Sequence, residues 1–366
     1  MAKLVYPGHR LPVSTVEKGY IPKGKSKFRI VKNDDLFSFL QEIGKKVDSL
    51  ILELFSLYND KKTSELVDYQ INVGGKRLRP ALAVLICLAF GGKLDDVLYP
   101  AAGLEIIHNY SLMIDDIIDG SLLRRGRSTV WAKFGNSMAN CVGVHYTASV
   151  FQASNRSKYP VKISEIFAKT MKNAVDGEIL DLLFSQKNQK EEHHVSKNRF
   201  KEVSEKDYFE MVKKKTATVL EACCEVGGIC ADAKEEQIKH LKNIGQKLGI
   251  AGQIKDDILD IFGKEGKSGK DIKEGKLGNI VIVLALKELS PRDKEKFLTI
   301  LSKEGVGNQE IEEAIDLIKK TNSHQKSLEL AKRFSEDAKK ELSFLPQNKW
   351  NESLKQFADY IATIEK

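Results

Sequence analysis

Apolar residues recur at intervals of three and four positions along most of the chain from Asp34 onward. The pattern is clearest at residues 36–58, 102–118, 165–184, 238–262, 311–320 and 327–345. Such intervals place apolar side chains along one face of a helix. We find no convincing run of alternating apolar and polar residues, which would predict strands. The pattern therefore predicts an all-α protein, built as a large bundle of long core helices.

The first 33 residues do not follow this pattern. They contain three prolines, three glycines and eight basic residues but one acidic residue, which gives a net charge of +7. The whole chain has 59 basic and 51 acidic residues. Residues 34–366 therefore contain 51 basic and 50 acidic residues and are nearly neutral. A basic surface that coats nucleic acid is therefore not expected. We predict an extended or flexible basic extension at 1–33, for targeting or docking, and a single helical domain at 34–366.

Two further segments interrupt the helical pattern. Residues 185–206 are almost wholly polar and are predicted to form a solvated connector, in which His193 and His194 are surface residues and not metal ligands. Residues 263–279 are rich in glycine and lysine, which supply backbone mobility and positive charge.

Composition and cysteine spacing narrow the expected location. The longest apolar runs, at 81–90 and 280–286, are shorter than the roughly 18 residues of a membrane span. The five cysteines lack the paired spacing of zinc ligands, and a chain of 366 residues does not depend on disulfides. We therefore expect a soluble cytoplasmic protein with reduced thiols.

Two acidic groups lie within predicted helices. Residues 113–119 read MIDDIID, so Asp115 and Asp119 are four positions apart and share a helix face. Residues 252–260 read GQIKDDILD and repeat the spacing with Asp256 and Asp260. Carboxylates on one face repel each other, whereas a hard divalent cation favours oxygen ligands placed together. Two unrelated solvated faces are the alternative, but both groups are embedded in apolar sequence, which favours metal ions held between two helices.

Basic residues accompany the acidic groups. Arg124 and Arg125 follow the first group, and GGKRLRP at 74–80 precedes a predicted helix whose first turn suits Pro80. Basic side chains and free N–H groups at a helix start form an anion site. Phosphates bridged to aspartates through Mg²⁺ and bound directly by Arg and Lys would fit this set. The other basic or polar candidates are Lys76, Arg77, Arg79, Lys215, Thr216, Lys267, Lys270 and Lys276.

With these motifs in this order, the sequence resembles the trans-isoprenyl diphosphate synthases, the polyprenyl synthetase family that includes farnesyl and geranylgeranyl diphosphate synthases. The resemblance covers about residues 36–366 and rests on GGKRLRP, EIIHNYSLMIDDIIDGSLLRRG, STVWAKFG, GEILDLLF, MVKKKTA, GQIKDDILD and GKDIKEGK. It implies the isoprenoid synthase fold, with helices around a central cavity, and by analogy a homodimer. It also implies a Mg²⁺-dependent prenyltransferase that condenses isopentenyl diphosphate with dimethylallyl, geranyl or farnesyl diphosphate.

The resemblance also assigns roles to residues. The implied metal ligands are Asp115, Asp119 and Asp256. The residues implied on the allylic side are Arg124, Lys215, Thr216, Gln253, Lys270 and Lys276, and those on the isopentenyl side are Lys76, Arg79, His108 and Arg125. Catalysis would rest on Asp115, Asp119, Arg124, Lys215 and Asp256, because Mg²⁺ and cationic side chains stabilise the departing diphosphate. The carbocation is then attacked by the isopentenyl double bond, and the released diphosphate takes the proton.

Product length is expected to depend on Tyr110, five residues before Asp115. The first acidic motif has no two-residue insertion, and Ser111 follows Tyr110 in place of a second aromatic residue. This resembles archaeal-type geranylgeranyl diphosphate synthases, whose aromatic ring forms the floor of the pocket. A helical wheel alone is less clear, because Tyr110 points about 140° away from Asp115 and Ser111 lies more directly beneath it. An ordinary core tyrosine remains the alternative.

Several alternatives and departures bear on this hypothesis. A terpene cyclase should lack the second aspartate motif and GGKRLRP, and a non-catalytic partner subunit should have lost one of the acidic groups or the basic motif, yet all are present. A farnesyl or longer-chain synthase remains an alternative. The run EGKLGNIV departs from the family's usual Thr or Ser and Pro after EGK, and GVHYTAS at 143–149 lacks the aspartate that often follows its glycine.

Overall fold

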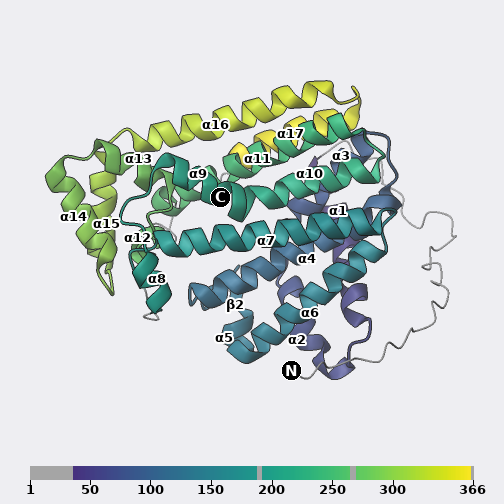
Figure 1. Ribbon diagram of the computed structural model, residues 1–366, viewed down its shortest axis with the longest axis horizontal. Coiled ribbons are helices and arrows are strands. Elements are labelled where there is room, and N and C mark those ends of the chain that lie inside the picture. The colour runs from purple at the N-terminus through teal and green to yellow at the C-terminus, as the bar shows by residue number, and fades with distance from the viewer. Residues whose placement is uncertain (1–35, 188–191, 264–268, 364–366) are drawn as a thin grey trace, which may run out of the picture.

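The computed structural model describes residues 36–187, 192–263 and 269–363 (Figure 1). The predicted extension at 1–33, part of the 185–206 connector and Lys267 lie outside these ranges. The helices are α1 (Leu36–Ser56), α2 (Ser64–Asn72), α3 (Leu78–Ala89), α4 (Leu94–Ile118), α5 (Val130–Phe134), α6 (Asn136–Asn155), α7 (Pro160–Phe184), α8 (His193–Asn198), α9 (Glu205–Val212), α10 (Thr218–Cys230), α11 (Glu235–Phe262), α12 (Lys270–Glu274), α13 (Ile280–Glu288), α14 (Pro291–Ser302), α15 (Asn308–Lys319), α16 (Ser323–Glu341) and α17 (Lys349–Thr363).

Short elements complete the description. Two single-turn 3₁₀ helices are η1 (Lys61–Thr63) and η3 (Leu342–Phe344), and η2 (Lys213–Ala217) is a π-helical turn between α9 and α10. The strands β1 (Leu123–Arg124) and β2 (Arg127–Ser128) form a small antiparallel hairpin directly after α4. The prediction of an all-α protein is confirmed, because each of the six periodic segments lies on a helix.

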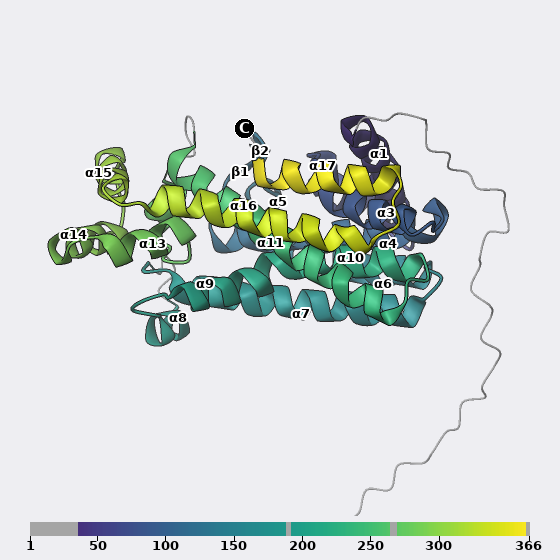
Figure 2. The ribbon, with the colours of Figure 1, turned by 90° about the horizontal axis from the view of Figure 1, so that it is seen from above.

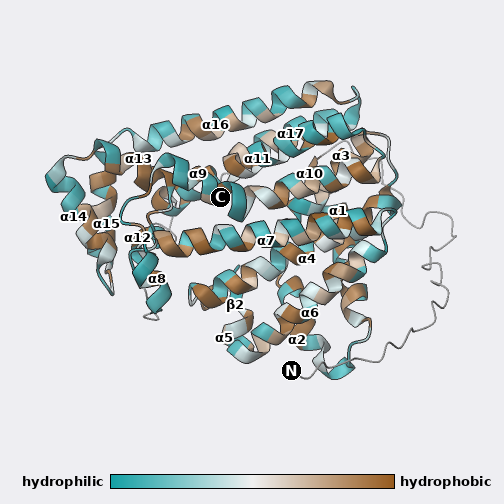
Figure 3. Ribbon diagram, in the orientation of Figure 1, coloured by the Kyte–Doolittle hydropathy of each residue, from teal (hydrophilic) through white to brown (hydrophobic). Residues whose placement is uncertain are grey.

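The longest helices run side by side through the middle of the molecule (Figures 1 and 2). The longest, α11, has 28 residues and is therefore roughly 42 Å long. Helices α4, α7 and α10 lie beside one another in the views, and α14 and α15 extend the molecule at one end. In Figure 3, α16 is largely hydrophilic along its visible side. No helix in the described ranges is long and apolar enough to cross a membrane.

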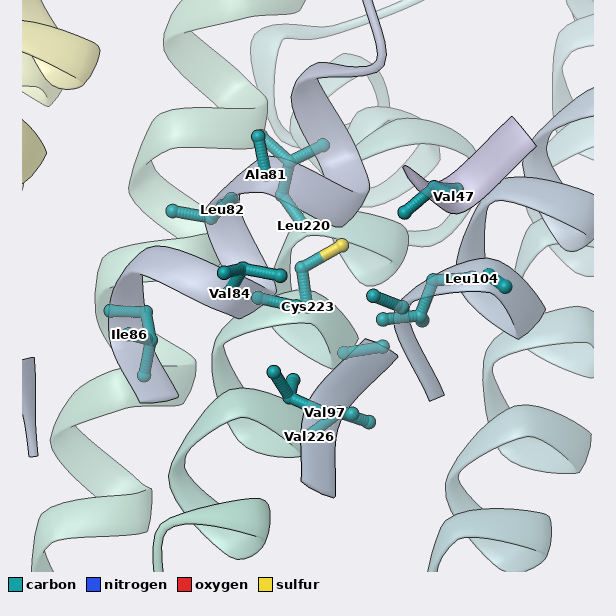
Figure 4. Packing of buried hydrophobic residues seen from close by; sticks show 14 of the residues in the cluster. Val47, Ala81, Leu82, Val84, Ile86, Val97, Leu104, Leu220, Cys223 and Val226 are labelled. Carbon is teal, nitrogen blue, oxygen red and sulfur yellow. The ribbon is translucent and has the colours of Figure 1, made fainter. Parts of the chain in front are cut away.

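The first of two buried apolar clusters lies where α3, α4 and α10 meet (Figure 4). Cys223 of α10 is surrounded there by residues such as Val84 of α3 and Leu104 of α4, and all three are fully buried. Burial raises the pKa of the Cys223 thiol, so it is a protonated, apolar core residue. Helix α10 packs closely against α3, where a Cβ on Gly227 would lie 2.4 Å from the Ala83 carbonyl oxygen.

The second buried apolar cluster lies among α9, α11 and α13–α16. Helix α11 joins the two clusters, since Leu241 and Leu248 belong to the first and Ile254 and Ile261 to the second. The apolar run at 280–286, too short for a membrane span, lies in helix α13, whose residues 280–285 are buried in the second cluster. Packing against the two clusters therefore holds in place the part of α11 that carries Asp256.

Candidate active site

A cavity of about 670 Å³ opens between α4, α7, α10 and α11. It brings together every residue to which the resemblance assigned a role except Lys76, whereas the further candidates Arg77 and Asp260 do not line it. The lining includes Arg79, His108, Tyr110, Asp115, Asp119, Arg124, Arg125, Lys215, Thr216, Gln253, Asp256, Lys270 and Lys276. These residues come from segments between α3 and the loop after α12, so the fold gathers the motifs at one place.

The first acidic group lies at the end of α4, where Asp115 and Asp119 both line the cavity. The third carboxylate, Asp116, is buried and has another role. Arg124 donates hydrogen bonds to it from Nε, at 3.0 and 2.9 Å, and from Nη2, at 2.8 Å. Asp116 therefore orients the hairpin that follows α4, and Arg124 reaches the cavity from that hairpin.

The hairpin positions both arginines through its tight turn. Arg125 and Gly126 at its tip have φ values of 54° and 74°, in the left-handed region. Arg125 then extends toward the GGKRLRP segment, where a Cβ at Gly75 would lie 2.7 Å from its Nη1 atom. The glycine therefore leaves space for the guanidinium beside the backbone, and a side chain there would displace it.

The GGKRLRP motif divides its cations between two roles. Arg79, in the first turn of α3, donates from Nη1 to Nε2 of His108 at 3.0 Å, and both residues line the cavity. Within the described ranges the buried Nε of Arg79 has no hydrogen-bond partner, so it can still donate to a ligand. Burial and the neighbouring arginines lower the pKa of His108 well below its ordinary value, which keeps the ring neutral.

Arg77 is the structural member of the motif. It is only 4% exposed, and it donates to Asp48 at 2.6 Å and to Glu105 at 3.1 Å. The sequence predicts that Arg77 contributes to an anion site with the other two cations of the glycine turn. Its side chain instead binds these two carboxylates and does not line the cavity. Lys76 also lies outside the cavity lining, with Nζ 5.6 Å from the centre of the Tyr360 ring on α17.

The second acidic group on α11 contains three carboxylates with three different positions. Asp256 lines the cavity. Asp257 is buried, where it accepts hydrogen bonds from Tyr208, Gln253 and the backbone of Ile280, and burial raises its pKa to about 8. Asp260 accepts from the backbone N–H of Asp271 at 2.8 Å. Of these three carboxylates, only Asp256 belongs to the cavity lining.

The π-helical turn η2 carries Lys215 and Thr216 into the cavity. The turn is pressed between α7 and α11, where a Cβ at Gly177 would lie 2.1 Å from the Lys215 backbone nitrogen and one at Gly249 would lie 2.4 Å from Ala217 Cα. Thr216 donates to Gln253 at 2.7 Å, which links the turn to α11. A π-turn often marks a functional site because its extra residue reorients side chains.

Two carboxylates of α7 hold Lys215, and neither was assigned a role from the sequence. Lys215 Nζ lies 2.6 Å from Glu178 and 2.7 Å from Asp181. Burial opposes ionisation of Asp181, but Lys215 and Lys276 lower its pKa to about 2. Burial dominates at Glu178 and raises its pKa to about 7. Their three-residue spacing in GEILDLLF places both carboxylates on one helix face, as the four-residue spacing does in the aspartate groups, so the sequence held a comparable signal.

The lysines of the glycine-rich loop lie over the first acidic group. Lys270 and Lys276 are 3.3 and 3.4 Å from Asp119. Partial burial would raise the pKa of this carboxyl, but the charges of the lysines outweigh it and lower the pKa. Ser185, after α7, pairs with Lys276 in an isolated antiparallel bridge that fixes the loop. In the departing run EGKLGN, Asn279 caps α13 and donates to Asp271, so the segment is ordered around the site.

Most of the remaining lining is apolar, and much of it comes from α4 and α7. It includes Tyr110, Ile107, Met171, Ala174, Val175 and Ile179, with Ser111 as a polar member. The cavity therefore has a charged end and an apolar end, which suits an amphipathic ligand with an anionic head.

The three carboxylates assigned as metal ligands face this cavity from α4 and α11. In the described ranges, no group of three or more His, Cys, Asp or Glu side chains is arranged to hold a metal ion alone. The assignment of Asp115, Asp119 and Asp256 as metal ligands stays a prediction. Their oxygen donors are the type that Mg²⁺ prefers, and substrate phosphates normally complete such a shell.

A helical bundle with opposed aspartates and basic residues at one end of an apolar cavity has the arrangement of a diphosphate-dependent prenyltransferase. The polyprenyl synthetase family model matches residues 60–318. The chain is 34% identical over 296 residues to a short chain isoprenyl diphosphate synthase of Methanocaldococcus jannaschii, covering 79% of this chain and 84% of the relative. The chain belongs to the polyprenyl synthetase family. It is a prenyltransferase, a polyprenyl diphosphate synthase that joins isopentenyl diphosphate to an allylic diphosphate.

Two solved structures show the same fold. One is a geranylgeranyl pyrophosphate synthetase from Pyrococcus horikoshii, at a TM-score of 0.80 and 33% identity, covering 90% of this chain and 98% of that chain. The other is a polyprenyl synthase from Caulobacter crescentus complexed with calcium and isoprenyl diphosphate, at a TM-score of 0.78 and 28% identity, covering 92% and 99%. The predicted isoprenoid synthase fold is confirmed.

Proposed function

We propose that this prenyltransferase is a Mg²⁺-dependent geranylgeranyl diphosphate synthase. The observation that carries the proposal is a cavity lined by acidic and basic side chains at one end and by apolar residues, with the Tyr110 ring among them, at the other. Relatives near 30% identity differ in product, so chain length depends on the residues of this cavity. A farnesyl or longer-chain product is the second candidate, and a non-catalytic partner subunit is the third.

Mg²⁺ would be held by Asp115, Asp119 and Asp256, with substrate phosphate oxygens completing the coordination. The donor set fits, since Asp115 and Asp119 face the cavity from the end of α4 and Asp256 faces it from α11. The calcium in the related polyprenyl synthase is consistent with a divalent ion in this fold. When bound, Mg²⁺ supplies charge that stabilises a departing diphosphate.

The chain's own residues bind and orient the two substrates. Lys215, Lys270 and Lys276 present ammonium groups on the side of Asp119, where they can bind the allylic diphosphate and stabilise it as it leaves. Arg79 retains a free donor for the diphosphate of isopentenyl diphosphate. His108 is neutral and accepts from Arg79, so it holds this guanidinium in place. The apolar walls exclude water from the carbocation while the isopentenyl double bond attacks it.

The first experiment is product analysis. The purified protein is incubated with Mg²⁺, isopentenyl diphosphate and each allylic starter in turn, and the dephosphorylated products are measured. A single twenty-carbon product is expected. A series of longer products would contradict the role of Tyr110 as the floor of the pocket, and no product from any starter would favour the partner-subunit hypothesis.

Asp115→Ala should reduce turnover by about a hundredfold or more with an unchanged circular dichroism spectrum, because metal binding contributes several kcal/mol.

We also propose that the protein forms a homodimer through the outer faces of α6 and α7. These helices lie together along one side of the molecule (Figure 2), and apolar residues are visible on both in Figure 3. Val144 and Phe151 of α6 are 72% and 52% exposed. The exposed stripe of α7 contains Val161, Glu165, Ala168, Lys172, Val175 and Ile179.

This stripe can bind a second copy of itself. Its positions alternate at four and three residues, the spacing of a helix–helix seam. Glu165 and Lys172 are seven residues apart, so an antiparallel copy of α7 would bring opposite charges together. Val175 and Ile179 also line the active-site cavity, so the second copy would cover the outer wall of that cavity.

We further propose a single helical domain over 34–366, preceded by the basic extension, in a reducing compartment such as the cytoplasm. The continuous helix α11, which contributes to both core clusters, supports a single domain. The five cysteines are free thiols, four of them buried, which suits a reducing environment.

A further inference from the structure

The Tyr110 ring separates the cavity from helix α6. Tyr110 lines the cavity from α4. On its other side, a Cβ placed on Gly143 of α6 would lie 2.8 Å from the ring carbon Cε2 and 3.4 Å from Cδ2. Helix α6, described along its whole length, contributes no residue to the cavity lining. The ring is therefore the partition between the cavity and the backbone of α6.

Gly143 is needed for space and not for backbone conformation. It lies within α6, and its φ is not in the left-handed region that favours glycine. Inside a helix, glycine is less favourable than alanine. Carbon atoms pack at about 3.5–4.0 Å, so a methyl group at 2.8 Å could not coexist with the ring where it stands.

We propose that Gly143 determines product length together with Tyr110, an inference that rests on the proposed synthase function. The missing side chain lets the ring rest against α6 and leaves the cavity wide. A side chain at 143 pushes the ring toward the cavity, because α6 closes the opposite side, and the shortened cavity ends elongation earlier. Removal of the ring opens the cavity as far as the bare backbone at Gly143, so elongation continues further.

The test is a two-by-two set of variants at positions 110 and 143. Gly143→Ala should shift the product distribution toward shorter chains by one five-carbon unit, and Tyr110→Ala should shift it toward longer chains. In the Tyr110→Ala background, Gly143→Leu should fill the vacated space and bring the product back toward the wild-type length. Asn155→Leu, at the exposed end of the same helix, is the matched control and should leave the distribution unchanged.

The readout is the shift relative to the wild-type product, so it does not depend on whether the wild type stops at twenty carbons. An unchanged distribution in Gly143→Ala, or identical products from Tyr110→Ala and Tyr110→Ala/Gly143→Leu, would overturn the inference. If Gly143→Ala does not fold, Tyr110→Ala/Gly143→Leu against Tyr110→Ala alone decides the question. A wild-type protein that makes no product would instead overturn the proposed function, and this inference with it.

Discussion

At the scale of single residues, Arg77 and Arg79 have different roles although they are two positions apart. We expect Arg77→Ala to lower the free energy of unfolding in urea by about 3–5 kcal/mol, because Glu105, 2% exposed, would be left buried and without its ion pair. Arg79→Ala should change stability little. It should raise the KM for isopentenyl diphosphate by about tenfold or more, since a hydrogen bond to a charged group contributes about 1.5–3 kcal/mol.

The two variants control each other. Equal losses of stability in both would contradict the division of roles, and so would an unchanged KM in Arg79→Ala. Sequence reasoning grouped both arginines as cations on a glycine turn. It could not separate them, because burial of Arg77 depends on Asp48 and Glu105, which lie on α1 and α4. The same limit applies to Asp256 and Asp257, which are adjacent in sequence but differ in what surrounds them.

At the scale of elements, the π-turn η2 depends on two glycines of its neighbours. We expect Gly177→Ala to force α7 and η2 apart, since its Cβ would lie 2.1 Å from the Lys215 nitrogen. Overpacking of this kind costs about 1–3 kcal/mol, so thermal stability should fall modestly. The displaced Lys215 should raise the KM for the allylic diphosphate more than the KM for isopentenyl diphosphate, as measured by steady-state kinetics.

Gly44→Ala on α1 is the matched control, because its Cβ would come no closer than 3.2 Å to another segment, at Arg77 Cγ, and would meet no backbone atom there. It should leave both KM values unchanged. Equal effects of Gly177→Ala on both substrates would contradict a specific role of η2 in holding Lys215. The period of the apolar residues was sufficient to predict the long helices. It did not reveal η2, because one extra residue in a turn leaves composition and spacing almost unchanged.

At the scale of the whole molecule, the cavity forms where distant motifs meet, from Arg79 on α3 to Lys276 after α12. The order of those motifs indicated the family and hence the fold. The sequence alone did not show that Glu178 and Asp181 would hold the lysines of two separate segments at the cavity. That arrangement depends on the packing of α7 against η2 and on the bridge between Ser185 and Lys276.

The exposed faces of α6 and α7 lead to a prediction about assembly. We expect the wild type to sediment as a dimer, and Phe151→Glu to shift it to a monomer, because burying such a side chain contributes about 1.5–3 kcal/mol per copy.

Glu165→Lys alone and Lys172→Glu alone should each weaken the dimer by placing like charges together, and the double exchange should restore it. Sedimentation at several concentrations measures all four variants. A monomeric wild type would contradict the proposed interface, and a double exchange no stronger than either single variant would exclude the antiparallel pairing of α7. Because Val175 and Ile179 belong to both this face and the cavity, monomeric variants should also lose turnover.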